Sequence, residues 1–145
     1  LRGATRNEMM NDPKNTVVSQ LMMTKVRCVS PDDQLQLAVR IMEEAKITCV
    51  IVDLKDPSRG YGILTQKDVI GMLFDDIVDF ESTTVEEVMS HPCLALAPQW
   101  SLETAVACMR MMGVRRAPVV EAGKLLGLLS FTDVFRHSFG DSAAP

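Results

Sequence analysis

The sequence predicts an α/β (α+β) protein made of two copies of one β–α–β–β–α unit, each preceded by a short helix. The main observation is an internal repeat. Residues 18–52 match residues 85–119 at an offset of 67, and the aligned positions share apolar residues and a proline. A second match, at an offset of 65, aligns Gly62–Val69 with Gly127–Val134. A copy of roughly 60 residues is marginal alone, so we expect the two copies to share a core.

Composition narrows the class of protein. Hydrophobic residues make up 47% of the 145 residues and charged residues 23%, as in a folded domain. The net charge of −4 gives no basic surface for nucleic acid. No apolar run approaches the ~20 residues that cross a bilayer, and no secretory pattern is present, so we expect a cytoplasmic protein. The four cysteines lack the spacing of a zinc site.

The repeat also sets the boundaries that we expect along the chain. Residues 1–15 are polar and show no periodic apolar pattern, so we expect a linker or tail there. The sequence begins without methionine, so we expect a fragment of a longer protein. The first copy takes residues 16–74 and the second copy takes residues 84–140. An acidic linker, residues 75–83, joins the copies, and residues 141–145 form a short tail.

Each copy is expected to begin with a short lead-in helix followed by a short extended segment. The helices are predicted at Thr16–Met23 and Thr84–Ser90, about two turns each. The extended segments are predicted at Arg27–Val29 and Cys93–Leu96.

The main helix of each copy has a proline near its start and one apolar stripe. Ser30 offers a capping hydroxyl before Pro31 in the first copy, and Pro98 recurs in the second, where Ser101 is an alternative cap. The stripes follow the i, i+3, i+4, i+7 spacing of an amphipathic helix. They consist of Leu35, Ala38, Val39 and Met42, and of Leu102, Ala105, Val106 and Met109.

Two strands and a final helix complete each copy. The strands are predicted at Cys49–Val52 and Gly62–Leu64 in the first copy, and at Ala117–Val120 and Gly127–Leu129 in the second. The last helices should start near Lys67 and Thr132. Two helices would then cover one side of the sheet in each copy.

A hydroxyl residue followed three positions later by Asp recurs at the last strand-to-helix turn. The pairs are Thr65 with Asp68, and Ser130 with Asp133. One interpretation is a capping box, which only stabilises the start of a helix. The other is a ligand site, because a capping box usually carries the longer Glu or Gln, and a helix N-terminus suits polar or anionic ligands. A carboxylate there can accept hydrogen bonds from both hydroxyls of a ribose.

The duplicated unit resembles a tandem pair of cystathionine-β-synthase (CBS) domains, a Bateman module, over roughly residues 17–139. The resemblance is carried by the order and spacing of several segments. They are Leu21-Met22-Met23-Thr24, Val88-Met89-Ser90, the helices headed by Pro31 and Pro98, Gly113–Val120, and the two Gly-x-x-hydroxyl-x-x-Asp segments. It implies two units packed about a pseudo-two-fold axis. It also implies a regulatory module that binds AMP, ADP, ATP or S-adenosylmethionine in clefts between the two repeats.

The resemblance also implies which residues would contact such a ligand. Asp68 and Asp133 would hold ribose hydroxyls, with Thr65 and Ser130 beside them. Lys67 lies within the first motif. Thr132 lies within the second motif. The segments around one base would include Thr24, Val26 and Val50. The segments around the other base would include His91, Cys93, Ala117 and Pro118.

The two copies differ in charge around the motif. The second copy offers Arg115 and Arg116 before its strand, and Arg136 and His137 in its last helix, and arginine forks match phosphate oxygens. The aligned positions in the first copy are uncharged; they are Thr48, Cys49, Gly71 and Met72. We therefore expect the second copy to hold the tighter site for a phosphorylated ligand. The alternative is that Arg115 and Arg116 are solvated or paired with Glu121 or Glu103.

Three classes of function remain open from the sequence. The first is a sensor of an adenine nucleotide, or of S-adenosylmethionine or NAD. The second is a structural or dimerisation module of a larger protein, in which the two aspartates only cap helices. The third, an enzyme, is disfavoured because no nucleophile–base set, phosphate loop or metal cluster can be identified, so we expect no catalytic residue, metal or required cofactor.

Partners follow from the same resemblance. Such modules commonly pair into flat dimers through exposed helices. Apolar surface beyond one stripe is offered by the helices that bear Met109, Met111 and Met112, together with Met72, Leu73 and Phe74. We expect a homodimer, with an attached or separate effector protein, and no nucleic-acid partner.

Overall fold

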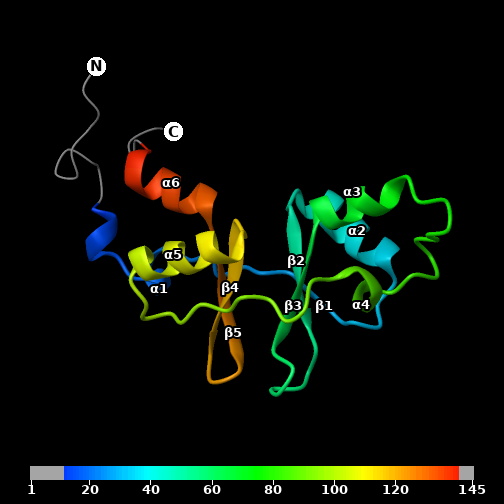
Figure 1. Cartoon of the computed structure of the whole chain (residues 1–145), viewed down its shortest axis with the longest axis horizontal. Helices are drawn as coiled ribbons and strands as arrows, with labels where there is room; N and C mark the ends of the chain where they lie inside the picture. The colour runs from blue at the N-terminus through cyan, green and yellow to red at the C-terminus, as the bar shows by residue number, and fades with distance from the viewer. Residues whose placement is uncertain (1–11, 141–145) are drawn as a thin grey trace. The chain divides into compact units, whose positions relative to one another are not determined.

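The computed structural model describes residues 12–140 (Figure 1). Residues 1–11 of the expected N-terminal tail and the expected C-terminal tail, residues 141–145, lie outside this range. The chain forms two compact units. One is Val26–Cys93, here called the central unit, and the other, the terminal unit, combines the described residues of Leu1–Lys25 and Leu94–Pro145. Both units contain helices and strands, which confirms the predicted α/β (α+β) class.

The central unit contains the predicted β–α–β–β–α order. Strand β1 (Cys28–Val29) pairs in parallel with β2 (Cys49–Asp53), which pairs antiparallel with β3 (Tyr61–Thr65). Helix α2 (Leu35–Ala45) connects β1 to β2, and α3 (Gln66–Leu73) follows β3 directly. The parallel β1–β2 pair requires this helical crossover, whereas β2 and β3 are joined by a turn.

The terminal unit repeats this arrangement from the main helix onward. Strands β4 (Arg116–Glu121) and β5 (Lys124–Ser130) form an antiparallel pair, preceded by α5 (Leu102–Met112) and followed by α6 (Phe131–Phe139). The extended segment expected near Leu96 makes a single parallel bridge to β4 in place of a full strand.

The lead-in helices are exchanged between the repeats. Helix α1 (Val18–Leu21) belongs to the terminal unit, where Val18 N–H donates to Trp100 O at 2.9 Å. Helix α4 (Val85–Val88) belongs to the central unit, where Val85 N–H donates to Asp33 O at 2.8 Å. Each lead-in helix is thus bonded to the segment just before the main helix of the other repeat. Both are shorter than the predicted segments.

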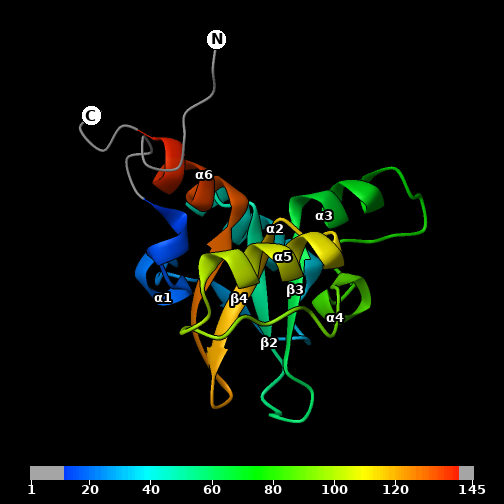
Figure 2. The ribbon, with the colours of Figure 1, turned by 60° about the vertical axis from the view of Figure 1, so that its left-hand side comes forward.

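The short 3-10 helix η2 (Pro13–Asn15) precedes α1 in the terminal unit. It contacts both α5 and α6, and Figures 1 and 2 show it and α1 beside α6. The last residues of the expected N-terminal linker are therefore part of the folded terminal unit.

Each unit has its own buried cluster. In the central unit the cluster joins the α2 stripe to β2, β3 and Val85 of α4. In the terminal unit it joins the α5 stripe to β4, β5 and Val18 of α1. The exchanged lead-in helix supplies each cluster with a fully buried valine. Each exchanged helix therefore adds apolar surface to the core of the unit that it joins.

The two main helices begin differently from each other. Ser101 caps α5 as predicted, since its Oγ accepts a hydrogen bond from Thr104 N–H at 3.1 Å. The predicted cap by Ser30 is wrong, because α2 begins at Leu35 and its N-cap residue makes no side-chain bond. The Asp33 carboxylate instead accepts the Ser30 N–H at 2.8 Å and closes a turn before the helix.

Gly71 lies in α3 at an exposed helical position where an added Cβ would meet nothing within 4 Å. Replacing it with alanine should stabilise the protein by about 0.5–1 kcal/mol, because glycine loses more backbone entropy in a helix than alanine. Chemical denaturation measures this gain. Gly60→Ala is the control: that site is equally open, but its φ of +70° strains any side chain, so it should not stabilise.

Candidate functional site

The candidate site of the central unit is the turn where β3 ends and α3 begins. Thr65 is the N-cap residue of α3, and its Oγ1 accepts a hydrogen bond from Asp68 N–H at 3.2 Å. Asp68 Oδ2 accepts the Thr65 N–H and the Thr65 hydroxyl, each at 2.9 Å. Both side chains are half-buried. The turn is a capping box in which Asp takes the usual place of Glu or Gln.

The terminal unit has a matching turn where β5 ends and α6 begins. Ser130 is the N-cap residue, and its Oγ accepts the Asp133 N–H at 3.2 Å. The Ser130 hydroxyl donates to Asp133 Oδ2 at 2.9 Å. Both residues are again half-buried. The two turns share the hydroxyl bonds, whereas the bond from the N-cap backbone N–H to the aspartate is found only at Thr65 among the described residues.

The capping-box interpretation is confirmed at Thr65–Asp68, and at the second turn Ser130 caps α6 through its hydroxyl. Both arrangements leave room for a ligand. The bonds that cap each helix reach only Oδ2 of Asp68 and of Asp133. A carboxylate has about four lone-pair sites on two oxygens. Oδ1 of each aspartate therefore lies outside the cap, at a helix N-terminus whose partial positive charge favours polar and anionic groups.

The residues on the strand next to each turn differ between the two units. In the terminal unit Arg116 lies opposite Ser130 in the β4–β5 register, and Arg115 O accepts the Phe131 N–H at 2.9 Å. In the central unit Cys49 lies opposite Thr65, and Thr48 O accepts the Gln66 N–H. The arginines are thus placed next to the Ser130–Asp133 turn.

The arginine pair takes part in none of the ion pairs found within residues 12–140. Glu103, one of the acids considered as a partner, instead lies 4.0 Å from Lys14. Arg115 is exposed and Arg116 is half-buried. Both residues therefore keep solvent-accessible surface and have no ion-pair partner among the described residues.

The other candidate polar residues near the turns lie on the two final helices. Lys67 is exposed in the first turn of α3, as Thr132 is in α6. Arg136 is exposed one turn further along α6. His137 is half-buried, and its Nε2 lies 3.1 Å from Thr16 Oγ1, so its ring contacts the segment before α1.

Three of the residues proposed to frame a base are buried. Val50 and Ala117 have no exposed surface and belong to the cores of their units. Pro118 is also buried, and its carbonyl accepts the Leu96 N–H at 2.9 Å. Val50 and Ala117 could therefore meet a ligand only through their backbone.

The remaining candidates, Thr24, Val26, His91 and Cys93, belong to neither turn. Thr24 is exposed in the terminal unit and Val26 is half-buried in the central unit. His91 Nε2 lies 2.6 Å from Arg59 O, and Cys93 Sγ donates to Tyr61 O at 3.2 Å. His91 and Cys93 thus lie at the start of β3, whereas Asp68 follows its end. Burial raises the pKa of the Cys93 thiol to about 11, so the thiol is neutral at physiological pH.

Sequence reasoning missed one polar contact near the candidate site. Thr16 is buried, and its hydroxyl approaches His137 from a segment more than a hundred residues away in sequence. No sequence signal links these residues, because the contact depends on the exchange of the lead-in helix.

Within residues 12–140, no three His, Cys, Asp or Glu side chains gather as a metal site would require. In the same range, no helix combines the length and apolar character needed to cross a membrane.

Comparison with known proteins identifies the family. The family model of the CBS domain matches residues 18–75 and 85–140. The CBS domain-containing protein YhcV of Bacillus subtilis is 28% identical over 127 residues, covering 88% of this chain and 89% of YhcV. The chain therefore belongs to the CBS-domain family and contains two CBS domains.

Solved structures share the fold. A hexameric CBS-CP12 protein from bloom-forming cyanobacteria has a TM-score of 0.78 and 27% identity, covering 85% of this chain and 68% of that one. CBSX2 in complex with AMP has a TM-score of 0.69 and 25% identity, covering 83% of this chain and 93% of that one. CBS-domain pairs are regulatory ligand-binding modules, and one of these neighbours holds AMP.

Proposed function

We propose that the chain is a regulatory module that binds an adenine nucleotide and catalyses no reaction. The observation that carries the proposal is the duplicated turn, in which Asp68 and Asp133 each keep one carboxylate oxygen outside the helix cap. That oxygen can accept hydrogen bonds from ribose hydroxyls. The AMP bound by the similar protein CBSX2 supports this class of ligand.

The charge around the terminal turn favours a phosphorylated ligand. Arg115 and Arg116 flank the Ser130–Asp133 turn without an ion pair to another described residue, and arginine binds phosphate through two parallel hydrogen bonds. The corresponding strand of the central unit offers Thr48 and Cys49 instead. We therefore assign the tighter nucleotide site to the terminal unit, and a weaker one to the central unit.

No cofactor is required for this function, because binding alone transmits the signal. The nucleotide can shift a conformational equilibrium of the module only by the difference in its affinity for the two states. An attached or separate effector protein would respond to that shift.

A thermal-shift screen tests the proposed function. The full chain is melted with AMP, ADP, ATP, S-adenosylmethionine and NAD in turn. A ligand at about a hundredfold excess over its Kd stabilises the native state by about 2.7 kcal/mol, which raises the Tm by several degrees. We expect the rise with AMP or a related adenine nucleotide. Unchanged melting across the whole panel would favour a structural or dimerisation module.

The assignment of Arg116 to a phosphate group gives a separate prediction. Arg116→Ala should weaken AMP binding about tenfold or more, as expected for losing hydrogen bonds to a charged group. Adenosine binding should change little, because adenosine lacks the phosphate. Calorimetric titration with both ligands measures the difference. Arg40→Ala removes an exposed arginine from α2 and should leave both affinities unchanged. Equal losses for AMP and adenosine would contradict the phosphate role.

A further inference from the structure

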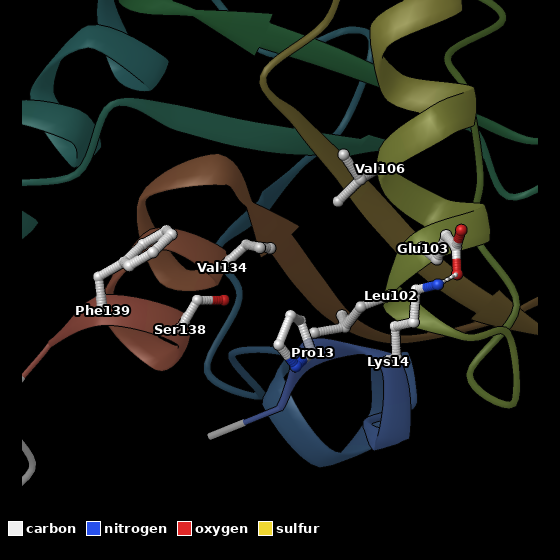
Figure 3. Close-up of a pocket in the computed structure, with 8 residues that line it drawn as sticks. All are labelled: Pro13, Lys14, Leu102, Glu103, Val106, Val134, Ser138 and Phe139. Carbon is white, nitrogen blue, oxygen red and sulfur yellow. Dashed lines mark ion pairs between the residues drawn. The ribbon is translucent and has the colours of Figure 1, made fainter. Parts of the chain in front are cut away.

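The terminal unit contains a groove between η2, α5 and α6 (Figure 3). Its volume is about 310 Å³, whereas a cavity of about 150 Å³ already holds benzene. Most of the lining is apolar and comes from Pro13, Leu102, Val106, Val134 and Phe139. The groove therefore has room for a molecule the size of two fused aromatic rings.

The segment that forms one wall of the groove has a structural equivalent in the central unit. Leu102 N–H donates to Thr16 O at 3.0 Å in the terminal unit. Leu35 N–H donates to Thr83 O at 2.8 Å in the central unit. Both residues of one pair align with both residues of the other at the offset of 67. The segment before each lead-in helix is therefore tied to a main helix in the same way.

The equivalent segment of the central unit carries an aromatic side chain where the groove has a proline. Phe80 aligns with Pro13 at the offset of 67. Phe80 is half-buried and packs against the apolar cluster of the central unit, as do Val39 and Val69. Those two valines align with two of the valines that line the groove. The central unit therefore shows that an aromatic ring fits this place in the repeat.

Ser138 adds one polar group to the groove. Only 3% of the residue is exposed, yet no hydrogen bond joins its hydroxyl to another residue within 12–140. In that range no fully enclosed side-chain oxygen lacks a partner, so the Ser138 oxygen keeps access to the groove. Figure 3 shows this oxygen pointing toward the other lining side chains. Because buried polar groups are normally hydrogen-bonded, the unpaired hydroxyl indicates a polar group on a ligand.

The charged residues that line the groove are paired with each other. Lys14 Nζ lies 4.0 Å from Glu103 Oε2, at the edge of the groove (Figure 3). An ionised ligand would therefore meet no unpaired charge among the lining residues. Because burying an unpaired charge costs free energy, the groove favours an uncharged ligand.

We propose that this groove binds a small, uncharged aromatic molecule that carries a hydroxyl group. The ring lies where Phe80 lies in the other repeat, and the ligand hydroxyl bonds to Ser138 Oγ, which can both donate and accept. A buried aromatic ring contributes a large apolar contact area. None of the lining residues is a candidate nucleotide contact, so the site is distinct from the nucleotide site. The proposal goes beyond nucleotide binding and does not depend on it.

Calorimetric titration of the full chain with 2-naphthol tests the site, because this probe has two fused rings and a single hydroxyl. The wild-type chain should bind it saturably, and excess AMP should not displace it. Pro13→Phe gives the terminal unit the residue found at position 80, and the added ring should weaken binding about tenfold or more by filling the groove. Circular dichroism verifies folding. Ser19→Phe adds a ring at an exposed position of α1 and should leave the Kd unchanged.

Three results would overturn the proposal. They are absence of saturable binding to the wild-type chain, an unchanged Kd in the folded Pro13→Phe variant, and competitive displacement of 2-naphthol by AMP. The last result would assign the ring to the nucleotide site instead of the groove.

Ser138→Ala tests the hydroxyl contact. The affinity for 2-naphthol should fall roughly two- to tenfold, as expected for losing one hydrogen bond between neutral groups, and the affinity for naphthalene should not fall. Alanine favours a helix, so the free energy of unfolding should not decrease, which chemical denaturation verifies. Ser19→Ala removes an exposed hydroxyl from α1 and should change neither affinity. Equal changes for 2-naphthol and naphthalene in Ser138→Ala would contradict the proposed contact.

Discussion

Asp133→Ala should abolish most of the rise in Tm that AMP produces at the terminal site. The substitution removes the carboxylate proposed to hold the ribose, and it also removes one capping partner of α6. The loss of the cap alone should lower the free energy of unfolding by roughly 1 kcal/mol. The two effects are separated by comparing melting with and without AMP, since only the ligand-dependent part reports the ribose contact.

The matched control for Asp133 is Asp33, which accepts a backbone N–H three residues away at 2.8 Å but lies outside both turns. Asp33→Ala should lose a similar amount of stability and keep the full response to AMP. If Asp133→Ala also kept the full response, the carboxylate would be a helix cap only.

Gly127→Ala should destabilise the protein by about 1–3 kcal/mol, the cost of overpacking a tightly packed site. A Cβ at this position would lie 2.6 Å from Met23 O and 2.9 Å from Met22 Sδ. The bonds between Met23 and Leu128, at 2.8 and 2.9 Å, hold that backbone against β5. The backbone must therefore move to admit even a methyl group. Chemical denaturation measures the loss.

Gly62 is the equivalent position in the central unit and provides the comparison. A Cβ there would lie 2.7 Å from Met89 Sδ but 3.3 Å from the nearest backbone atom, Ser90 O. The flexible methionine side chain can move at little cost, so Gly62→Ala should cost less than Gly127→Ala. Equal losses would show that backbone contact does not decide the cost at position 127.

The local elements of this fold could be predicted from the sequence because their signals are local. The apolar stripe of α5 and the hydroxyl cap Ser101 predicted a helix that the structure contains. The Ser130–Asp133 spacing predicted the strand-to-helix turn, since both capping partners lie within one helical turn. The site geometry at each turn was therefore accessible from sequence.

Non-local features could not be predicted in the same way. The internal repeat shows that α1 and α4 are equivalent, but it does not show which repeat each helix packs on. The contact of Thr16 with His137 follows from that exchange. Ser30 was predicted as a helix cap because it precedes a proline and two acids, yet Asp33 bonds back to it and delays the helix to Leu35. Competition between two local hydrogen-bond patterns decided that boundary.

Calorimetric titration of AMP tests the central claim most directly, using the wild-type chain and the double variant Asp68→Ala/Asp133→Ala. The account predicts saturable binding to the wild-type chain and its loss in the double variant, with circular dichroism showing that the variant remains folded. Absence of binding to the wild-type chain, or undiminished affinity in the folded double variant, would contradict a nucleotide site at the repeated turns.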